Sequence, residues 1–573
     1  MSKTIKLKRQ KRVFFELQLL FFVPLYVLPS CRQKNPAPSS ELIAQINLKR
    51  GEVAICGRTA QQFGTVEFPI SGDRKVNQDF NLAIALLHSF EYDEAEKVFA
   101  KIIDEAPGCA MAYWGVAMCN YHPLWTPPSG PELKKGAKAI EIAQSISQKS
   151  TRETDYINAI SVFYKDWDKI DYKTRCISFE KGMEKLYTKY PDDKEAAIFY
   201  ALALDAAADP TDKSFKNQRK AGSILNALYP YEPNHPGIAH YIIHTYDYPE
   251  LAALALPMAR KYALIAPSSA HALHMPSHIF TRLGLWDECI RSNIASVASA
   301  RCYAETVGIK GHWAQELHGL DYLVYAYLQK GENKLAKEQW EYLKTIDNVY
   351  PIDFAGAYAF AAIPSRYLLE NKLWNEAADL KIHPDNFPWK NFPWQVAIVH
   401  FTRLMGSIHI GQINSAESEL KTLNAIYDTL TQQKDSYKAN QVLIQIKMSE
   451  AWIQFKKGKN GEALTLMNLA TDMEDKTEKH PVTPGEVIPA RELLGDMLMQ
   501  MNKPNEALAA YELDLKKHPN RFNGVYGAGL AAEKSQNVKK TTSYYKQLLA
   551  IVSPASSDRP ELVSIKLFFK NNQ

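Results

Sequence analysis

Cysteine is scarce in this sequence, with seven residues among 573, and no two of them form a CxxC pair. This scarcity excludes a thiolate zinc knuckle and a dense disulfide framework. Cys119 and Cys289 fall inside helical patterns, where we expect buried free thiols that act as small apolar residues. Cys56 precedes the repeats described below and is the cysteine that we expect in a disulfide, although the sequence indicates no partner for it.

Net charge is also nearly absent. Six of the 68 positive charges and one of the 63 negative charges lie in the first thirty residues, so the remainder carries both signs in equal number. Nucleic-acid binding needs a concentrated positive surface that releases counterions from phosphates, and no nucleic-acid partner is expected. The chain also lacks a P-loop, a GxGxxG turn and a GxSxG elbow, so it offers no motif for nucleotide chemistry or α/β-hydrolase catalysis.

The first thirty residues have the order of an export signal. A basic stretch runs to Arg12, residues 13–28 are rich in Phe and Leu, and residues 28–31 read Leu-Pro-Ser-Cys. The apolar run is shorter than the twenty or so residues that a spanning helix needs. Its end resembles the lipobox of bacterial lipoproteins, which implies lipidation at Cys31, and residues 32–40 then read as a flexible tether. We therefore expect a membrane-anchored lipoprotein of the cell envelope, in the outer membrane or facing the periplasm.

Two alternatives for this segment stay open. An ordinary signal peptide or an uncleaved interfacial anchor has the same basic and apolar regions. Glu16, inside the apolar run, weakens the export signal.

A 34-residue unit recurs along the chain. Its clearest copy, near the end, has small and apolar residues at positions 7, 8, 11, 20, 24 and 32, which are Leu494, Gly495, Leu498, Ala507, Tyr511 and Pro519. The next copy follows one place late, with Ala528-Gly529, Ala532, Thr541, Tyr545 and Pro554. The pattern resembles the tetratricopeptide repeat (TPR), in which small residues at 8 and 20 let two antiparallel helices approach and a proline ends the second helix.

Weaker copies of this unit extend from about residue 77 to residue 552, and strand-like Val/Ile/Thr alternation is weak. The sequence therefore predicts an all-α fold, a TPR-like α/α superhelix of antiparallel helix pairs. The predicted segments are a signal peptide (1–30), a tether and pre-repeat segment (31–76), N-terminal repeats (77–235), histidine-rich central repeats (236–345), divergent repeats (346–480) and C-terminal repeats (481–573).

Histidine is concentrated in the centre of the chain. Eight of the fifteen histidines lie between His235 and His318, a stretch of 84 residues. Counted in the repeat frame, polar residues recur at positions 2, 5 and 9 of three successive first helices: His240 and His244 at 5 and 9, then His271, His274 and His278, then His318, Asp321 and Tyr325. At about 100° per residue these positions point within about 60° of one another, so each set forms one stripe.

In the TPR fold that these segments resemble, that stripe faces the concave groove. The eight residues are therefore the predicted ligand-binding groove, with Asp247 and Tyr241 available as supporting groups. A single histidine in a helix is usually structural, but the set as a whole favours a functional site. The alternative without metal is that the histidines and tyrosines bind an extended peptide or acidic ligand by hydrogen bonds, or only form a buried polar network. A one-residue shift of register would turn the stripe toward the helix interface.

Imidazoles at i and i+4 can hold one divalent cation, and a third ligand from a neighbouring helix completes a facial set with open positions. A divalent transition metal is thus an alternative reading of the site, and its candidate ligands are His240, His244, His274 and His278. A zincin is excluded, because Tyr241 stands where the general-base glutamate of that motif would be. Pro276 is expected to interrupt the helix that carries three of the histidines.

Two stretches carry a closer resemblance, the Ala-Met-Ala-Tyr-Trp-Gly of residues 110–115 and the His-Ala-Leu-His-Met-Pro-Ser-His of residues 271–278. With Pro519-Asn520-Arg521-Phe522 they look like a family of long bacterial TPR proteins that has no established activity. The resemblance covers most of the chain after residue 76. Since TPR proteins in general are binding scaffolds, it implies a protein, peptide or small-molecule partner.

Two functions follow from these patterns. In the first, a lipid-anchored TPR scaffold holds a partner protein, peptide or small ligand in a histidine-rich concave groove. In the second, the same histidines form a metal site with hydrolytic or oxidative chemistry inside a helical shell. The sequence favours the scaffold, which would not be an enzyme, and the metal-dependent enzyme is the alternative.

Overall fold

The structure, a computed structural model, describes residues 37–57, 62–72, 74–124, 127–552 and 557–571. The predicted leader with Cys31, and Pro554 of the last repeat, lie outside the described residues.

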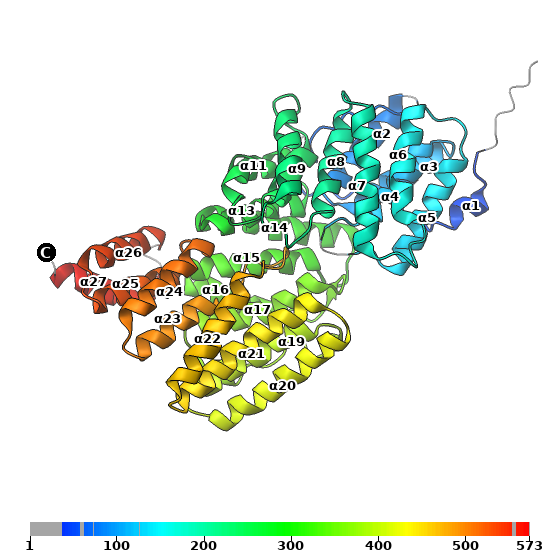
Figure 1. The fold of residues 1–573 in the computed structure, drawn as a ribbon. Coiled ribbons are helices and arrows are strands. Elements are labelled where there is room, and N and C mark those ends of the chain that lie inside the picture. Colours follow the sequence, from blue (N-terminus) through cyan, green and yellow to red (C-terminus); the bar gives the residue numbers. More distant parts are fainter. Residues whose placement is uncertain (1–36, 58–61, 73, 125–126, 553–556, 572–573) are drawn as a thin grey trace, which may run out of the picture. The chain divides into compact units, whose positions relative to one another are not determined.

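Helices make up most of the described chain (Figure 1). In the first half they are α1 (Ser40–Ala44), α2 (Arg74–His88), α3 (Tyr92–Glu105), α4 (Ala110–Cys119), α5 (Gly130–Ser145), α6 (Thr151–Tyr164), α7 (Tyr172–Lys189), α8 (Lys194–Ala206), α9 (Lys216–Leu228), α10 (Pro236–Thr245), α11 (Ala252–Ile265), α12 (Ala270–His274), α13 (Pro276–Leu283) and α14 (Trp286–Val307). In the second half they are α15 (Ala314–Gln329), α16 (Asn333–Leu343), α17 (Phe354–Glu370), α18 (Trp374–Ala378), the 3-10 helix η1 (Trp389–Asn391), α19 (Pro393–His409), α20 (Ile413–Gln432), α21 (Ser436–Lys456), α22 (Asn460–Asp475), α23 (Ala490–Gln500), α24 (Pro504–Lys517), α25 (Phe522–Lys534), α26 (Val538–Ile551) and α27 (Glu561–Asn571).

Two short strands, β1 (His312–Trp313) and β2 (Val349–Tyr350), form the β-structure of the described residues. They pair in parallel, with His312 opposite Val349. The chain is thus an all-α, TPR-like solenoid, as the repeat frame predicts.

Consecutive helices pack as pairs, and the first helices of successive pairs also contact one another (Figure 1). Helix α10 contacts α8 and α13, α12 contacts α15, and α15 contacts α17. These first helices therefore form a continuous inner layer. In α10 and α17 most side chains are buried on every face.

Small residues sit where helix pairs approach, as the frame predicts. A Cβ atom added at Gly495 would lie 2.5 Å from the ring of Tyr511, and a Cβ at Gly527 would lie equally close to the same ring. Ala507, at position 20 of the frame, is fully buried. The Tyr511 ring is thus enclosed by two helices that can approach it only because these positions lack larger side chains.

Pro276 interrupts its helix as predicted. Helix α12 ends at His274 and α13 begins at Pro276, and the hydroxyl of Ser277 donates to the carbonyl of His274 at 2.7 Å. The segment Pro364-Ser365-Arg366 echoes Pro276-Ser277-His278 88 residues later, but Pro364 lies inside α17 without ending it. The kink places His271 and His274 on one short helix and His278 on the next.

A long segment crosses the inner layer. Residues 477–489, which we term the covering segment, connect α22 to α23 and lie against helices far away in sequence. Tyr322 of α15 donates to the carbonyl of Thr483 at 3.0 Å, and Arg366 of α17 donates to the carbonyl of Gly485 at 2.8 Å. The inner face of the solenoid is therefore covered at these helices.

Cys56 forms a disulfide, as expected, and the structure identifies its partner. Cys56 is bonded to Cys302 of α14, 246 residues later. Cys119 and Cys289 are buried free thiols, as predicted. The disulfide ties the pre-repeat segment to the central repeats.

None of the described helices combines the length and the apolar character that crossing a bilayer requires.

We predict that Gly495→Ala lowers the free energy of unfolding by about 1–3 kcal/mol. The new methyl group would overpack against the ring of Tyr511, which cannot move away because the helix that carries Gly527 lies against the same ring. The matched control is Gly461→Ala in α22, where a Cβ would meet nothing within 4 Å. That control should be neutral or stabilising by up to about 1 kcal/mol. Chemical denaturation of both variants checks the prediction, and equal midpoints would show that the repeat register is wrong.

Candidate metal centre

Six of the predicted histidines come together as two groups of three. The first triad is His240 and His244 of α10 with His271 of α12. The second triad is His274 of α12, His278 of α13 and His318 of α15. In each triad, one ligand nitrogen of every member lies within 4.8 Å of the others.

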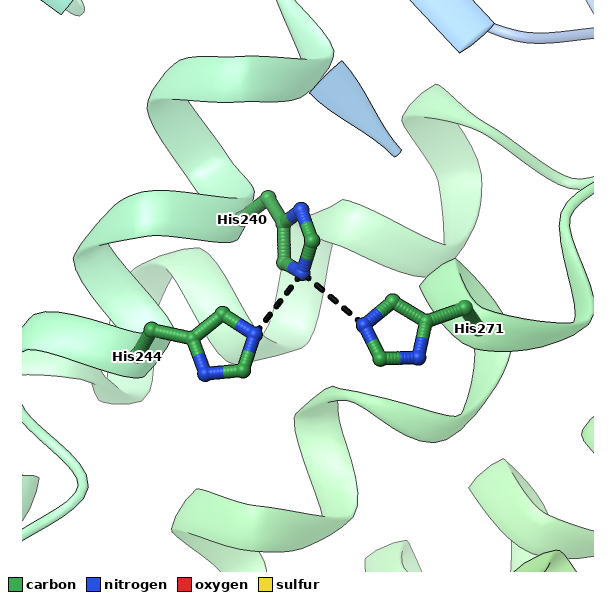
Figure 2. A group of neighbouring side chains, drawn as sticks. All are labelled: His240, His244 and His271. Carbon is green, nitrogen blue, oxygen red and sulfur yellow. Dashed lines mark hydrogen bonds between the residues drawn. The ribbon is translucent and has the colours of Figure 1, made fainter. Parts of the chain in front are cut away.

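The first triad converges on one nitrogen of His240 (Figure 2). Its Nε2 lies 3.0 Å from Nε2 of His244 and 3.1 Å from Nε2 of His271. Its Nδ1 lies 2.6 Å from the carbonyl oxygen of His88. Because a carbonyl can only accept, Nδ1 of His240 carries the proton and Nε2 presents a lone pair to both neighbours.

In the second triad, the Nε2 atoms of His274 and His278 lie 3.1 Å apart. Nδ1 of His278 lies 3.0 Å from a carboxylate oxygen of Asp247, and Nδ1 of His274 lies 2.7 Å from Oδ1 of Asn293. The amide of Asn293 is oriented by its own Nδ2, which donates to the carbonyl of Cys289 at 2.8 Å. Both imidazoles therefore donate through Nδ1.

It follows that the two Nε2 atoms of the neutral imidazoles face each other with lone pairs and no proton between them. Such an arrangement is repulsive unless a cation lies between the nitrogens. Burial lowers the pKa of His274 well below its usual value and also lowers the pKa of His278, where the carboxylate of Asp247 opposes the shift. A metal ion bound to both Nε2 atoms would satisfy the two lone pairs.

The nitrogen separations suit a metal ion. Two ligands about 2.1 Å from one ion lie about 3.0 Å apart at a right angle and about 3.4 Å apart in a tetrahedron. The 3.0 and 3.1 Å separations around His240, and the 3.1 Å separation in the second triad, match the first arrangement.

Each triad is packed against one aromatic ring. The ring of Phe90 lies 4.4, 5.6 and 5.7 Å from the rings of His240, His244 and His271, measured between centroids. The ring of Tyr322 lies 4.7, 5.0 and 5.5 Å from those of the second triad. These rings exclude water from one side of each triad. The spacing of the histidines does not predict that Phe90 lies beside the first triad. The sequence also does not distinguish Tyr322 from the other tyrosines of the inner layer.

Asp247, which the sequence predicts as a supporting group, contacts His278 of the second triad. Besides His278, its carboxylate accepts from Nε of Arg282 at 2.8 Å and from Nζ of Lys479 at 3.1 Å. Burial by itself would raise the pKa of Asp247, but Lys479 and Arg282 hold it well below the usual value. The carboxylate stays ionised and fixes the orientation of the His278 ring.

The two triads have the same origin in the repeat frame. Each combines positions 5 and 9 of one first helix with position 2 of the next, so that His271 completes the pair of α10 and His318 completes the pair of α12 and α13. Six of the histidines that the spacing assigns to one stripe therefore lie together in the structure. The four residues predicted as one metal set, His240, His244, His274 and His278, are instead divided between two sites, because the i, i+4 pairs lie on different repeats.

Asp321 and Tyr325, the last members of the predicted groove, lie outside both triads. Asp321 forms an ion pair with Arg366, and Tyr325 accepts from Arg521 at 3.1 Å. In the segment Pro364-Ser365-Arg366, Arg366 stands at the position that His278 has in Pro276-Ser277-His278. Its guanidinium pairs with the carboxylate of Asp321. Burial raises the pKa of Asp321 to about 6 despite this partner.

The predicted residues do not line an open groove. His240 and His274 are fully buried, His278, His318 and His244 are 3%, 7% and 8% exposed, and His271 is half-buried. The covering segment and the aromatic rings account for this burial. A groove floor that binds an extended peptide would need these side chains at the surface.

A third group, which the sequence did not indicate, supports the first triad. Glu195 accepts from Nε2 of His88 at 2.9 Å and from Nε2 of His235 at 2.8 Å. Burial opposes its ionisation, but the two imidazoles hold the pKa of Glu195 at about 2. His88 in turn supplies the carbonyl that orients His240. His88 lies far outside the histidine-rich stretch, so only the fold brings it here.

Comparisons with known proteins add little about this site. No family model matches the chain, and no curated protein matches it. Solved structures with some likeness include a human IFIT1 dimer with PPP-AAAA (10% identity, TM-score 0.35, covering 81% of this chain and 94% of that one) and the APC/C Cut9–Hcn1 hetero-tetramer (13% identity, TM-score 0.26, covering 86% and 96%). Another is Naa15/Naa10 bound to HypK (10% identity, TM-score 0.23, covering 87% and 96%). Likeness at this level carries no argument about ligands.

We predict that Arg366→Met destabilises the chain by about 3–5 kcal/mol, because Asp321 is left as a buried, unpaired carboxylate. The double variant Arg366→Met/Asp321→Leu should recover part of this loss, as unfolding midpoints will show. Asp321→Asn should leave the metal content unchanged, since Asp321 belongs to neither triad. If Asp321→Asn abolished metal binding, our division of the histidines into two triads would be incorrect.

Proposed function

We propose that the chain is an exported, lipid-anchored helical-repeat protein whose function depends on transition-metal ions held by the two histidine triads. One observation carries the proposal: the Nε2 atoms of His274 and His278 lie 3.1 Å apart, while Nδ1 of each ring lies within hydrogen-bond distance of an oxygen acceptor, so that both Nε2 atoms of the neutral rings are inferred to lack a proton. Hydrogen bonds alone do not satisfy this pair.

The donor set indicates the class of metal. Imidazole nitrogens suit zinc, copper, nickel and iron, whereas magnesium and calcium prefer oxygen ligands. Three protein ligands leave at least one position open on a four-coordinate ion, and open positions are typical of catalytic rather than structural sites. A metal-dependent enzyme, hydrolytic or oxidative, is therefore the function that the geometry supports best.

The supporting groups have defined roles in this proposal. Asp247 and Asn293 each accept from Nδ1 of one ligand and leave its Nε2 for the ion. The His88 carbonyl does the same for His240. Such partners raise the basicity of the ligands and fix the ring orientation before the metal arrives.

The disulfide supports the proposed location. Disulfides persist in oxidising compartments, such as the bacterial periplasm and the cell surface, and are rare in the cytosol. The Cys56–Cys302 bond is therefore consistent with export, as the basic and apolar leader indicates. The lipid anchor at Cys31 is proposed from the leader sequence.

Partner binding is the second candidate, and a specific cavity favours it. A cavity of about 810 Å³ is lined by Trp340, Phe360 and Leu368 together with charged residues of the loop after α18. Its mixture of aromatic, apolar and charged walls suits a peptide or small ligand. In this candidate the partner binds away from the buried histidines.

We predict about two equivalents of transition metal per chain in full-length protein purified in detergent without chelator. The variant His274→Ala/His278→Ala should lose about one equivalent, because it removes two of the three ligands of the second triad. Elemental analysis by mass spectrometry measures both.

The matched control is His312→Ala/His400→Ala, which removes two half-buried histidines outside the triads and should keep the full metal content. Circular dichroism verifies that each variant is folded. Absence of metal from the wild type, even after reconstitution with zinc, copper, nickel and cobalt, would refute the metal proposal and direct attention to partners.

We also predict that Cys31→Ser abolishes incorporation of labelled palmitate in a bacterial host and releases the chain from the membrane fraction. The reason is that lipidation uses the thiol and, after cleavage, the amine of this cysteine. Cys109→Ser, at a buried cysteine, is the control and should retain the label. Labelling that persists in Cys31→Ser would favour an ordinary or uncleaved signal.

A further inference from the structure

The two triads are immediate neighbours. His271 and His274 are one turn apart on α12 and belong to different triads, so a single short helix supplies both. The rings of His244 in the first triad and His278 in the second lie 6.2 Å apart between centroids. Ions bound at the two triads would therefore share one helix and adjoining ligands.

The ligands contribute no negative charge. All six are imidazoles, which bind metal in their neutral form. The carboxylate of Asp247 contacts Nδ1 of His278 on the side away from the facing nitrogens, and Arg282 and Lys479 already balance its charge. Two divalent ions would thus bring an uncompensated charge into this site.

Solvation can offset only part of that charge, because His271 is half-buried and the other five imidazoles are buried. Phe90 and Tyr322 pack against the triads, and the inner-layer residues beside them are buried. A bare ionic charge in such an environment carries a large desolvation penalty unless an opposite charge accompanies it. The open coordination positions are where an anion would supply that charge.

We infer that the two triads form one dinuclear centre and that its substrate or ligand is a small oxyanion, such as a phosphate or carboxylate group, that bridges the two ions. The inference rests on the proposed metal function. It follows from the adjacency of the triads, their uncharged donors and the apolar walls around them. Two-metal sites clamp oxygens of this kind from both sides.

The test uses the full-length protein loaded with two equivalents of Co²⁺, whose visible absorption reports each ligand field. Inorganic phosphate and acetate are the probes, titrated separately. We expect saturation at one anion per two cobalt ions, and whichever probe binds more tightly identifies the oxyanion class. Saturation at one anion per cobalt ion, or no spectral change with either probe, would overturn the inference.

Variants with one triad removed sharpen the test. His240→Ala/His244→Ala and His274→Ala/His278→Ala should each retain one cobalt ion and bind the anion at least tenfold more weakly than the wild type. Unchanged anion affinity in these variants would also overturn the inference. Should a variant fail to fold, the anion-to-metal ratio of the wild type decides alone, whereas wild type that binds no cobalt would instead refute the underlying metal proposal.

Discussion

The carboxylate of Asp247 joins three parts of the chain that lie far apart in sequence. It follows α10 directly, accepts from His278 and Arg282 of α13, and accepts from Lys479 of the covering segment, 232 residues later. Through these contacts the second triad gains its orientation, and the inner layer gains the segment that closes it from solvent. Loss of this carboxylate would destabilise both the second triad and the covering segment, because Lys479 and Arg282 would be left as buried, unpaired cations.

Similar pairs recur along the inner layer. Asp247 with Arg282, Asp321 with Arg366, and Glu492 with Arg521 each place an arginine against a buried carboxylate. Replacing such a pair by apolar residues is often neutral for stability, so their value to the fold lies in specificity. We interpret the series as fixing the register of successive helices, which sets where the histidines of one repeat meet those of the next.

Much of the fold and part of the site could be predicted from the sequence. The spacing of Gly495, Ala507 and Pro519 predicts the helix pairs, since close packing demands small residues at fixed intervals. The spacing of His240 and His244 predicts one helical stripe, because 3.6 residues per turn bring i and i+4 together. The missing N–H of proline predicts the interruption at Pro276, but Pro364 lies inside α17 without ending it, so tertiary packing decides which proline divides its helix.

The sequence by itself determined the all-α repeat architecture and the face on which the histidines lie, because both depend on periodicities of a few residues along one helix. Only the tertiary structure decided that His271 joins the first triad and His318 the second, that Asp321 pairs with Arg366, and that Cys56 bonds Cys302. It also decided that the stripe is buried, through the covering segment and Phe90. These outcomes depend on contacts between residues far apart in the chain, whose distances are set by how neighbouring helices pack and which no local pattern encodes.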